Sequence, residues 1–193
     1  MHSNLLLDNQ IEKEQTKKIN YIQKKLQLIL SNNGASISEI VCLCIGTDRS
    51  TGDALGPLTG SQLLQLLPEK ITVLGTVEHP VHATNLSDTL DEIQRSIENP
   101  FIIAIDACLG KSSNIGKIIV EDGPVKPGAA VNKDLNPVGS CHITGIVNVN
   151  GFMEHSVLQS TRLHRVLSLS TIICHGLNFA IKDYINSYNT IGV

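Results

Sequence analysis

The sequence predicts an α/β fold of three layers, in which a mostly parallel sheet lies between two layers of helices. Three observations predict it. Unbroken apolar runs of strand length occur at 40–45 and 101–105, as expected of parallel strands that are buried on both faces, and a further segment typical of a strand lies between them at 71–77. Segments with helical spacing of apolar residues separate these runs. Alternating strands and helices of such lengths are typical of parallel sheets whose crossover helices cover both faces.

The first segment, 5–30, is predicted to be an amphipathic helix, because its apolar side chains recur at mostly helical spacings with lysines between them. Asn33-Gly34 supplies a helix stop. We expect one α/β domain that comprises residues 1–193, with residues 1–34 as a helical extension packed on or beside it. The sequence leaves open whether this extension packs on its own domain or on a second copy.

The remaining elements follow in chain order. The sequence predicts further helices over 53–67 (ended by Pro68), 84–98 (capped by Asn85 or Ser87) and 152–187, and further strands over 116–122 and 142–149. Between the last two strands, the segment 122–140 is rich in proline and glycine. That composition indicates a long loop, and a loop of such length in a compact domain is usually functional.

Composition limits the class of protein. The chain has 193 residues, of which 41% are hydrophobic and 17% charged, so one domain with a real core is expected, and disorder or a coiled coil is not. Because only 3% are aromatic, the core must consist of Ile, Leu, Val and Ala. The net charge of −3 does not favour nucleic acid as a partner, since nucleic-acid-binding domains usually carry a basic excess.

The sequence also predicts a cytoplasmic protein. It contains no run of 18 apolar residues that could span a membrane, and its first residues lack the basic and apolar regions of a signal peptide. Its five cysteines are odd in number and mostly sit in apolar runs, as expected of buried thiols in a reducing compartment.

A candidate site follows from the predicted sheet. In open α/β sheets, ligands bind beyond the carboxyl ends of the strands, where the strand order reverses. If the order begins 2-1-3, this crevice lies between the strands at 40–45 and 101–105. Asp53 ends the loop 46–53, and Asp106 directly follows the strand at 101–105. Both carboxylates would then face this one crevice. A charge placed directly after five apolar residues is costly unless it is used or paired.

Two close carboxylates offer definite chemistry. They share one proton, so that the ionised partner can draw a proton from water while the protonated one polarises a carbonyl. No cofactor is expected; if the site holds a divalent metal, its ligands would be Asp53, Asp106 and His142. A structural alternative is equally open: Asp53 caps the helix that begins there, and Asp106 pairs with Arg49 or caps a turn. A nucleophilic Cys108 or Cys141 acting with His142 has no motif in its support.

Several segments of the sequence resemble those of a known protein family. The segment GTDRSTGDALGPLTG (46–60) followed by an apolar strand ending in Ile-Asp-Ala resembles the short YyaC-type sporulation proteins, which are related to the spore germination protease. The segment PGAAVNK (127–133) is similar to a Pro-Gly-rich segment of that protease. A more distant likeness, which includes Ser140-Cys141-His142, is to the hydrogenase maturation endopeptidases. The YyaC-type resemblance covers roughly residues 35–187.

The resemblance implies a phosphorylase/hydrolase-like fold and a peptidase-like site. It places Asp53 and Asp106 at the two aspartates thought essential in the germination protease. In the predicted enzyme these residues activate water, Arg49 orients Asp106 or the developing oxyanion, and Asp48 and His142 support the site. The loop 122–139 closes over an extended peptide, such as a segment of a small acid-soluble spore protein, in a sporulating cell or spore.

Two departures from these families keep an alternative open. The maturation endopeptidases follow the loop aspartate with a metal-binding Glu, where this chain has Ala54. The chain is also much shorter than the germination protease. The alternative is therefore a binding or regulatory protein of sporulation that keeps the protease fold without turnover. Neither a membrane nor nucleic acid is an expected partner, and a homo-oligomer stays open.

Overall fold

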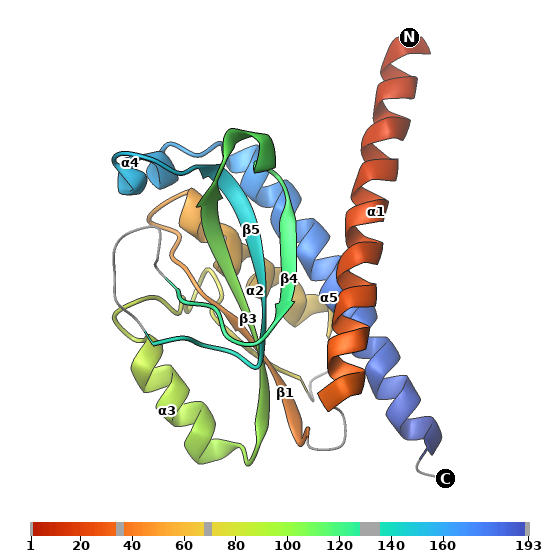
Figure 1. The fold of residues 1–193 in the computed structure, drawn as a ribbon, viewed down its shortest axis with the longest axis vertical. Helices are drawn as coiled ribbons and strands as arrows, with labels where there is room; N and C mark the ends of the chain where they lie inside the picture. Colours follow the sequence, from red (N-terminus) through yellow and green to blue (C-terminus); the bar gives the residue numbers. More distant parts are fainter. Residues whose placement is uncertain (1, 34–36, 68–70, 128–135, 192–193) are drawn as a thin grey trace.

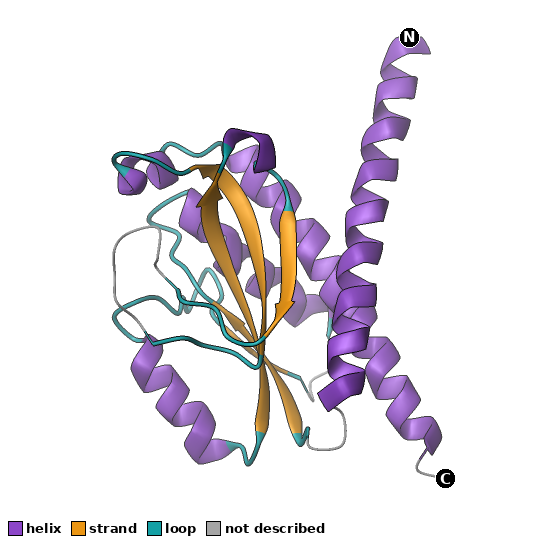
Figure 2. Ribbon diagram, in the orientation of Figure 1, coloured by secondary structure: helices purple, strands orange, loops and turns teal. Residues whose placement is uncertain are grey.

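The protein is built around a five-stranded sheet with the order β2-β1-β3-β5-β4 (Figures 1 and 2). The computed structural model describes residues 2–33, 37–67, 71–127 and 136–191. Four strands are parallel, namely β1 (Glu39–Cys44), β2 (Thr72–Leu74), β3 (Pro100–Gly110) and β5 (Cys141–Val149), and β4 (Ile118–Asp122) is antiparallel to β5. The predicted α/β class and mostly parallel sheet are confirmed, and the strand order 2-1-3, which the candidate site assumed, is the observed one.

Helices cover both faces of the sheet. One face packs against α2 (Leu55–Leu66) and α5 (Leu163–Ile191), and the other against α3 (Leu86–Ser96). The long helix α1 (His2–Asn33) lies along α5 and β4 (Figure 1). Three short helices complete the described chain: η2 (Gly52–Ala54), η3 (Ser112–Asn114) and α4 (Glu154–Gln159).

Alternation along the central strands explains their unbroken apolar runs. In β1, Cys42 and Cys44 belong to the core between the sheet and the helices α2 and α5, whereas Val41 and Leu43 belong to the core under α3. Successive side chains of a strand point to opposite faces, so a strand covered on both faces has no position for a solvated side chain. The two cores are built almost entirely from aliphatic residues and cysteine, as the composition predicts.

The helices α1 and α5 lie close together at Gly176. A Cβ atom at this glycine would lie 2.6 Å from the Cβ of Ile22, so only glycine allows the two helices to pack at this distance. Nearer their C-terminal ends, the amides of Gln23 and Gln27 both donate to Asp183 Oδ2, at 2.7 and 2.6 Å. This half of α1 is therefore held on α5 by buried apolar contacts and by a shared carboxylate.

Two predicted boundaries are wrong. The strand expected to end at residue 105 continues to Gly110, because β5 pairs with it as far as Val149. The strand expected over 71–77 pairs only over Thr72–Leu74, since the chain turns at Gly75 with φ +85°. The region 152–187, predicted to be helical, is confirmed as helical and consists of α4 and α5.

Residues of two predicted helix stops and part of the predicted loop are not among the residues that the structure describes. The helix α1 ends at Asn33, whereas Gly34, Pro68 and residues 128–135 lie outside the described residues. Over the described part of the chain, no helix combines the length and the apolar character that crossing a membrane requires.

The buried thiols predict a loss of stability at alkaline pH. Burial raises the pKa of Cys42 and Cys141 to about 12 and that of Cys44 well above its usual range. Because thiols of the unfolded chain ionise first, the free energy of unfolding is highest below about pH 8.5 and falls as pH rises toward 12. We expect a loss on the order of 1–2 kcal/mol per thiol at about pH 10.

Melting temperatures at about pH 8 and pH 10 test this expectation. The variant Cys42→Ala should show a smaller drop between the two pH values than the wild type. The matched variant Val41→Ala, which truncates the equally buried neighbour, should keep the full drop. An equal drop in all three proteins would contradict the assignment of the effect to the thiols.

Candidate functional site

The candidate site lies where β1 ends beside β3, at the reversal of the strand order. Here Ile45 N–H donates to Ile105 O at 2.7 Å and Gly46 N–H donates to Val81 O at 2.8 Å. The loop that follows closes on itself, because Thr47 N–H donates to Asp53 O at 3.2 Å. Its last residues form η2, which contacts β3. The segments that carry Asp53 and Asp106 are thus neighbours.

Two glycines of the 46–60 segment make this arrangement possible. A Cβ at Gly46, whose φ is +145°, would lie 2.0 Å from Asp53 O. A Cβ at Gly56 would lie 2.1 Å from Ile45 O. Both contacts are to backbone oxygens, which cannot move aside as the end of a flexible side chain can. The glycines therefore allow the first turn of α2 to pack directly on the end of β1.

Asp106 lies within β3, beyond the level at which β1 ends. Its Oδ1 accepts a hydrogen bond of 2.8 Å from the N–H of Ala107. Residues two apart on a strand point their backbone groups the same way, so Ala107 N–H points to the side on which Ile105 O bonds Ile45. Because β1 has ended there, the carboxylate takes the place of a strand partner. Asp106 is half-buried.

Asp53 lies in the 3₁₀ turn before α2. The N-cap of α2 is Ala54, and the N-cap of η2 is Thr51. Asp53 is therefore not at the N-cap position of either helical segment. A carboxylate in this first turn still interacts favourably with the helix dipole.

Asp48 and Arg49 occupy the exposed tip of the loop. Arg49 N–H donates to Thr47 Oγ1 at 3.3 Å, and its guanidinium makes no hydrogen bond or ion pair with any residue that the structure describes. The alternative in which Arg49 pairs with Asp106 is therefore wrong for the described arrangement. Both side chains face solvent at the rim of the site, where an incoming ligand would meet them.

Asp106 has two neighbours in the sheet, Thr144 and Cys108, of which sequence reasoning missed only Thr144. Thr144 of β5 is its register partner in the sheet, and Cys108 follows two residues later on the same face of β3. Burial raises the pKa of Cys108 to about 11, with an opposing effect from its hydrogen bond with the Thr144 side chain and a further rise from the charge of Asp106. The sequence already placed Cys108 near the crevice, whereas the position of Thr144 depends on the register between strands.

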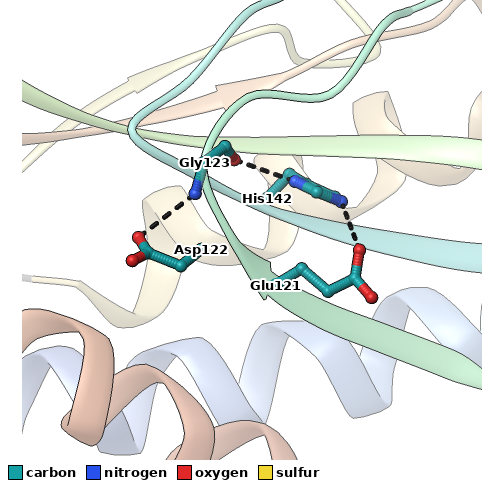
Figure 3. A network of polar contacts seen from close by, with 4 residues as sticks. All are labelled: Glu121, Asp122, Gly123 and His142. Atoms are coloured by element: carbon teal, nitrogen blue, oxygen red, sulfur yellow. Dashed lines mark hydrogen bonds and ion pairs between the residues drawn. The ribbon is translucent and has the colours of Figure 1, made fainter.

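His142 lies two residues before Thr144 on β5, opposite Ala104 rather than Asp106. Its Nδ1 is 2.9 Å from Gly123 O and its Nε2 is 3.6 Å from Glu121 Oε2 (Figure 3). The carbonyl requires Nδ1 to carry a proton as donor. Both ring nitrogens thus face groups of β4 and the turn after it, and His142 anchors this turn.

Two of the alternative sites that the sequence left open, a Cys–His pair and a metal site, are not formed among the described residues. His142 and Cys108 are offset by four residues along paired strands, about 13 Å at the usual rise, while Cys141 is fully buried and belongs to the core of the opposite face. His142 therefore forms no catalytic pair with Cys108 or Cys141 in the described part of the chain. Among the described residues, no three side chains of His, Cys, Asp or Glu come together as a metal site, so the ligand set Asp53, Asp106 and His142 is not formed.

Ser50, in the same loop, has a buried hydroxyl. Its Oγ has no hydrogen-bond partner among the described residues, and the side chain is only 4% exposed. An unpaired buried hydroxyl costs about 1–3 kcal/mol. We therefore expect Ser50→Ala to keep or raise the melting temperature. A decrease of more than a few degrees in thermal unfolding would show that the hydroxyl has a structural partner.

An exposed apolar turn lies beside the site. Phe152 is 93% exposed and Met153 is 63% exposed, and Met153 holds a left-handed conformation with φ +61°. This turn leads into α4, which contacts η2, and Leu158 of α4 lies against Gly52. Two large apolar side chains in water, on an element that contacts the Asp53 segment, are available to a partner molecule.

Comparison with known proteins identifies the family. Residues 10–176 match the family model described as "Protein of unknown function (DUF1256)". The chain belongs to the DUF1256 family. It is also 50% identical over 157 residues to the "Uncharacterized protein YyaC" of Bacillus subtilis (strain 168), which covers 80% of this chain and 77% of YyaC. The resemblance to YyaC-type proteins is thereby confirmed for this DUF1256 chain.

Solved structures similar to this DUF1256 chain include [NiFe] hydrogenase maturation proteases. HycI from Thermococcus kodakarensis KOD1 is 18% identical with a TM-score of 0.48, covering 79% of this chain and 97% of HycI. HybD from E. coli is 15% identical with a TM-score of 0.48, covering 75% of this chain and 93% of HybD. At these identities the likeness concerns the arrangement of strands and helices.

Proposed function

We propose that this chain is a peptidase-like hydrolase in which Asp53 and Asp106 activate water for cleavage of a peptide bond. The observation that carries the proposal is the placement of two carboxylate-bearing segments, η2 and β3, in contact at the reversal of the strand order. Ligand sites of open α/β sheets form at this position. The sequence resemblance to the germination protease points to the same two residues.

The chemistry follows from two carboxylates in one site. Like charges resist joint ionisation, so the pair titrates as a unit with one proton between its members. The ionised carboxylate takes a proton from the attacking water, and the protonated one donates to the carbonyl oxygen of the scissile bond. The hydrogen bond from Ala107 N–H fixes the orientation of the Asp106 carboxyl.

Nearby groups fit a substrate-binding role. Arg49 and Asp48 extend into solvent from the tip of the loop that leads to Asp53. In the proposed enzyme, Arg49 stabilises negative charge that develops on the substrate, and Asp48 contacts the bound chain. His142 acts indirectly, because it holds the turn at Gly123 from which the 122–140 segment begins.

The test is cleavage of a small acid-soluble spore protein, followed by intact-mass spectrometry. Wild-type chain and Asp106→Asn are compared side by side, each with and without a chelator. Fragments from the wild type alone, unchanged by the chelator, are the expected result. Equal fragments from both proteins would contradict the proposed role of Asp106, and activity lost in chelator would contradict a reaction by carboxylates alone.

A second candidate function is a binding or regulatory protein without turnover, and the exposed turn at Phe152 and Met153 favours it. Two large apolar side chains beside the site are suited to hold a protein partner. This candidate predicts that the same spore protein binds and stays intact. Binding measured by calorimetry, lost in Phe152→Ser and kept in Asp106→Asn, would select it over the hydrolase.

A further inference from the structure

The strand β3 continues past the end of β1, and this part of β3 has lost its strand partner on the β1 side. The last pair of the ladder between the two strands is Cys44 with Ile105, and the next residue of the chain, Ile45, donates its N–H to Ile105 O. From there β3 runs on to Gly110 with β5 on its other side (Figure 1). An edge of this kind presents a row of backbone groups that can pair with another chain.

Backbone alternation identifies the groups that face the side of β3 from which β1 has departed. Because Ile105 O bonds to β1, the N–H and C=O groups of Ala107 and Leu109 face the same side. The residue after them, Gly110, faces β5 instead, since its carbonyl accepts from Asn150 N–H at 2.8 Å. Ala107 and Leu109 therefore present two N–H and two C=O groups along the edge.

Three of these four groups have no hydrogen-bond partner among the described residues. Thr47 N–H, which would meet Ala107 O if β1 continued, donates to Asp53 O instead. Ala107 O and both backbone groups of Leu109 make no hydrogen bond within the described ranges. The fourth group, Ala107 N–H, donates to Asp106 Oδ1. Leu109 is only half-buried, so this part of the edge reaches the surface.

We propose that the peptide substrate binds as an additional strand along this edge of β3, an inference that rests on the proposed hydrolase function. An extended peptide carries N–H and C=O groups at the spacing of a strand, and strand addition to a sheet edge is a general mode of peptide recognition. Two peptide N–H groups donate to Ala107 O and Leu109 O, and one peptide C=O accepts from Leu109 N–H. The site thus selects an extended backbone.

The same pairing brings one peptide carbonyl to Asp106. In a regular ladder, the carbonyl two residues away from the one that bonds Leu109 N–H would bond Ala107 N–H. Because Ala107 N–H already donates to Asp106 Oδ1, this carbonyl lies beside the Asp106 carboxyl instead. A protonated carboxyl there donates to the carbonyl oxygen of the scissile bond. The edge of β3 therefore sets the register in which the substrate is cleaved.

Binding of a small acid-soluble spore protein, measured by calorimetry, tests the added strand. All proteins compared carry Asp106→Asn, which prevents cleavage and keeps an acceptor for Ala107 N–H. Leu109→Pro removes the free N–H, whereas Leu109→Ala truncates the same side chain and keeps it. Proline is tolerated at strand edges and bulges, and the register shifts between Cys108 and Leu109. Leu109→Pro should bind at least about tenfold more weakly than Leu109→Ala.

Amide hydrogen exchange, followed by NMR, gives a second readout that requires no substitution at Leu109. Leu109 N–H, without a partner in the described part of the chain, should exchange rapidly in the free Asp106→Asn protein. Saturation with the spore protein should slow this exchange by at least about tenfold. Unchanged exchange in the complex would overturn the proposal, as would equal affinities of Leu109→Pro and Leu109→Ala, or no binding at about 100 µM.

The added strand and the hydrolase can fail separately. With Asp106 intact, equal cleavage rates of Leu109→Pro and Leu109→Ala would overturn the added strand and leave the hydrolase standing. Binding that depends on Leu109 N–H, without cleavage by the wild type, would refute the hydrolase and support this edge as a peptide-binding site.

Discussion

Asp106→Asn is expected to lower the rate of peptide cleavage by about 10²–10⁴-fold, the usual contribution of a general acid or base. The substitution removes the titratable group while keeping an oxygen that accepts the 2.8 Å hydrogen bond from Ala107 N–H. The melting temperature should therefore stay close to the wild-type value. Rates measured on one peptide substrate, together with thermal unfolding, separate a chemical effect from a structural one.

Asp122→Asn is a matched control for this prediction. Asp122 Oδ1 accepts a hydrogen bond from the next residue, Gly123, at 3.1 Å, as Asp106 does from Ala107, but Asp122 lies on the edge strand β4. Asp122→Asn should keep full activity.

Asp53→Asn should behave like Asp106→Asn, because both carboxylates are required to share one proton. Full activity in Asp106→Asn would refute the proposed dyad.

Asp106→Ala separates the two roles of the carboxylate. It should lose activity as Asp106→Asn does and also lower the free energy of unfolding by about 1–3 kcal/mol, because Ala107 N–H loses its acceptor. If Asp106→Asn destabilised the protein as much as Asp106→Ala, the residue would be structural, and the binding-protein candidate would gain support.

Gly56→Ala is expected to lower the free energy of unfolding by about 3 kcal/mol, at the upper end of the usual cost of overpacking. The new Cβ would lie 2.1 Å from Ile45 O and 2.8 Å from Ile45 N and C. Since all three atoms are backbone of the strand end, either β1 or the start of α2 must move. The melting temperature should fall by about 6–12 °C, as calorimetry would measure.

Gly116→Ala is the control for the effect of glycine replacement itself. Gly116 has φ +84°, and no atom lies within 4 Å of the position that a Cβ would take there. Alanine at this position therefore lowers the free energy of unfolding only through its left-handed backbone conformation, by about 1–2 kcal/mol. Gly56→Ala should also reduce activity more than Gly116→Ala, because the displaced turn carries Asp53. A melting temperature of Gly56→Ala equal to that of the wild type would contradict the close packing of α2 on β1.

The pattern of apolar residues determined the sheet. Unbroken runs such as 40–45 and 101–105 suit strands buried on both faces, and β1 and β3 form there with the expected order β2-β1-β3. The spacing of the 46–60 segment also located the loop and placed Asp53 and Asp106 on neighbouring elements. These features depend on local periodicity and on glycine, which a sequence displays directly.

Strand register and helix packing were decided only by the tertiary structure. The extension of β3 to Gly110 and the pairing of Asp106 with Thr144 arise from hydrogen bonds to β5, which is distant in sequence. The contacts of His142 with Glu121 and Gly123 likewise follow from the register of β4 on β5. Asp53 differs from a helix cap because the chain inserts a 3₁₀ turn before α2. Such outcomes depend on long-range pairing and crossing geometry, which no local pattern of residues encodes.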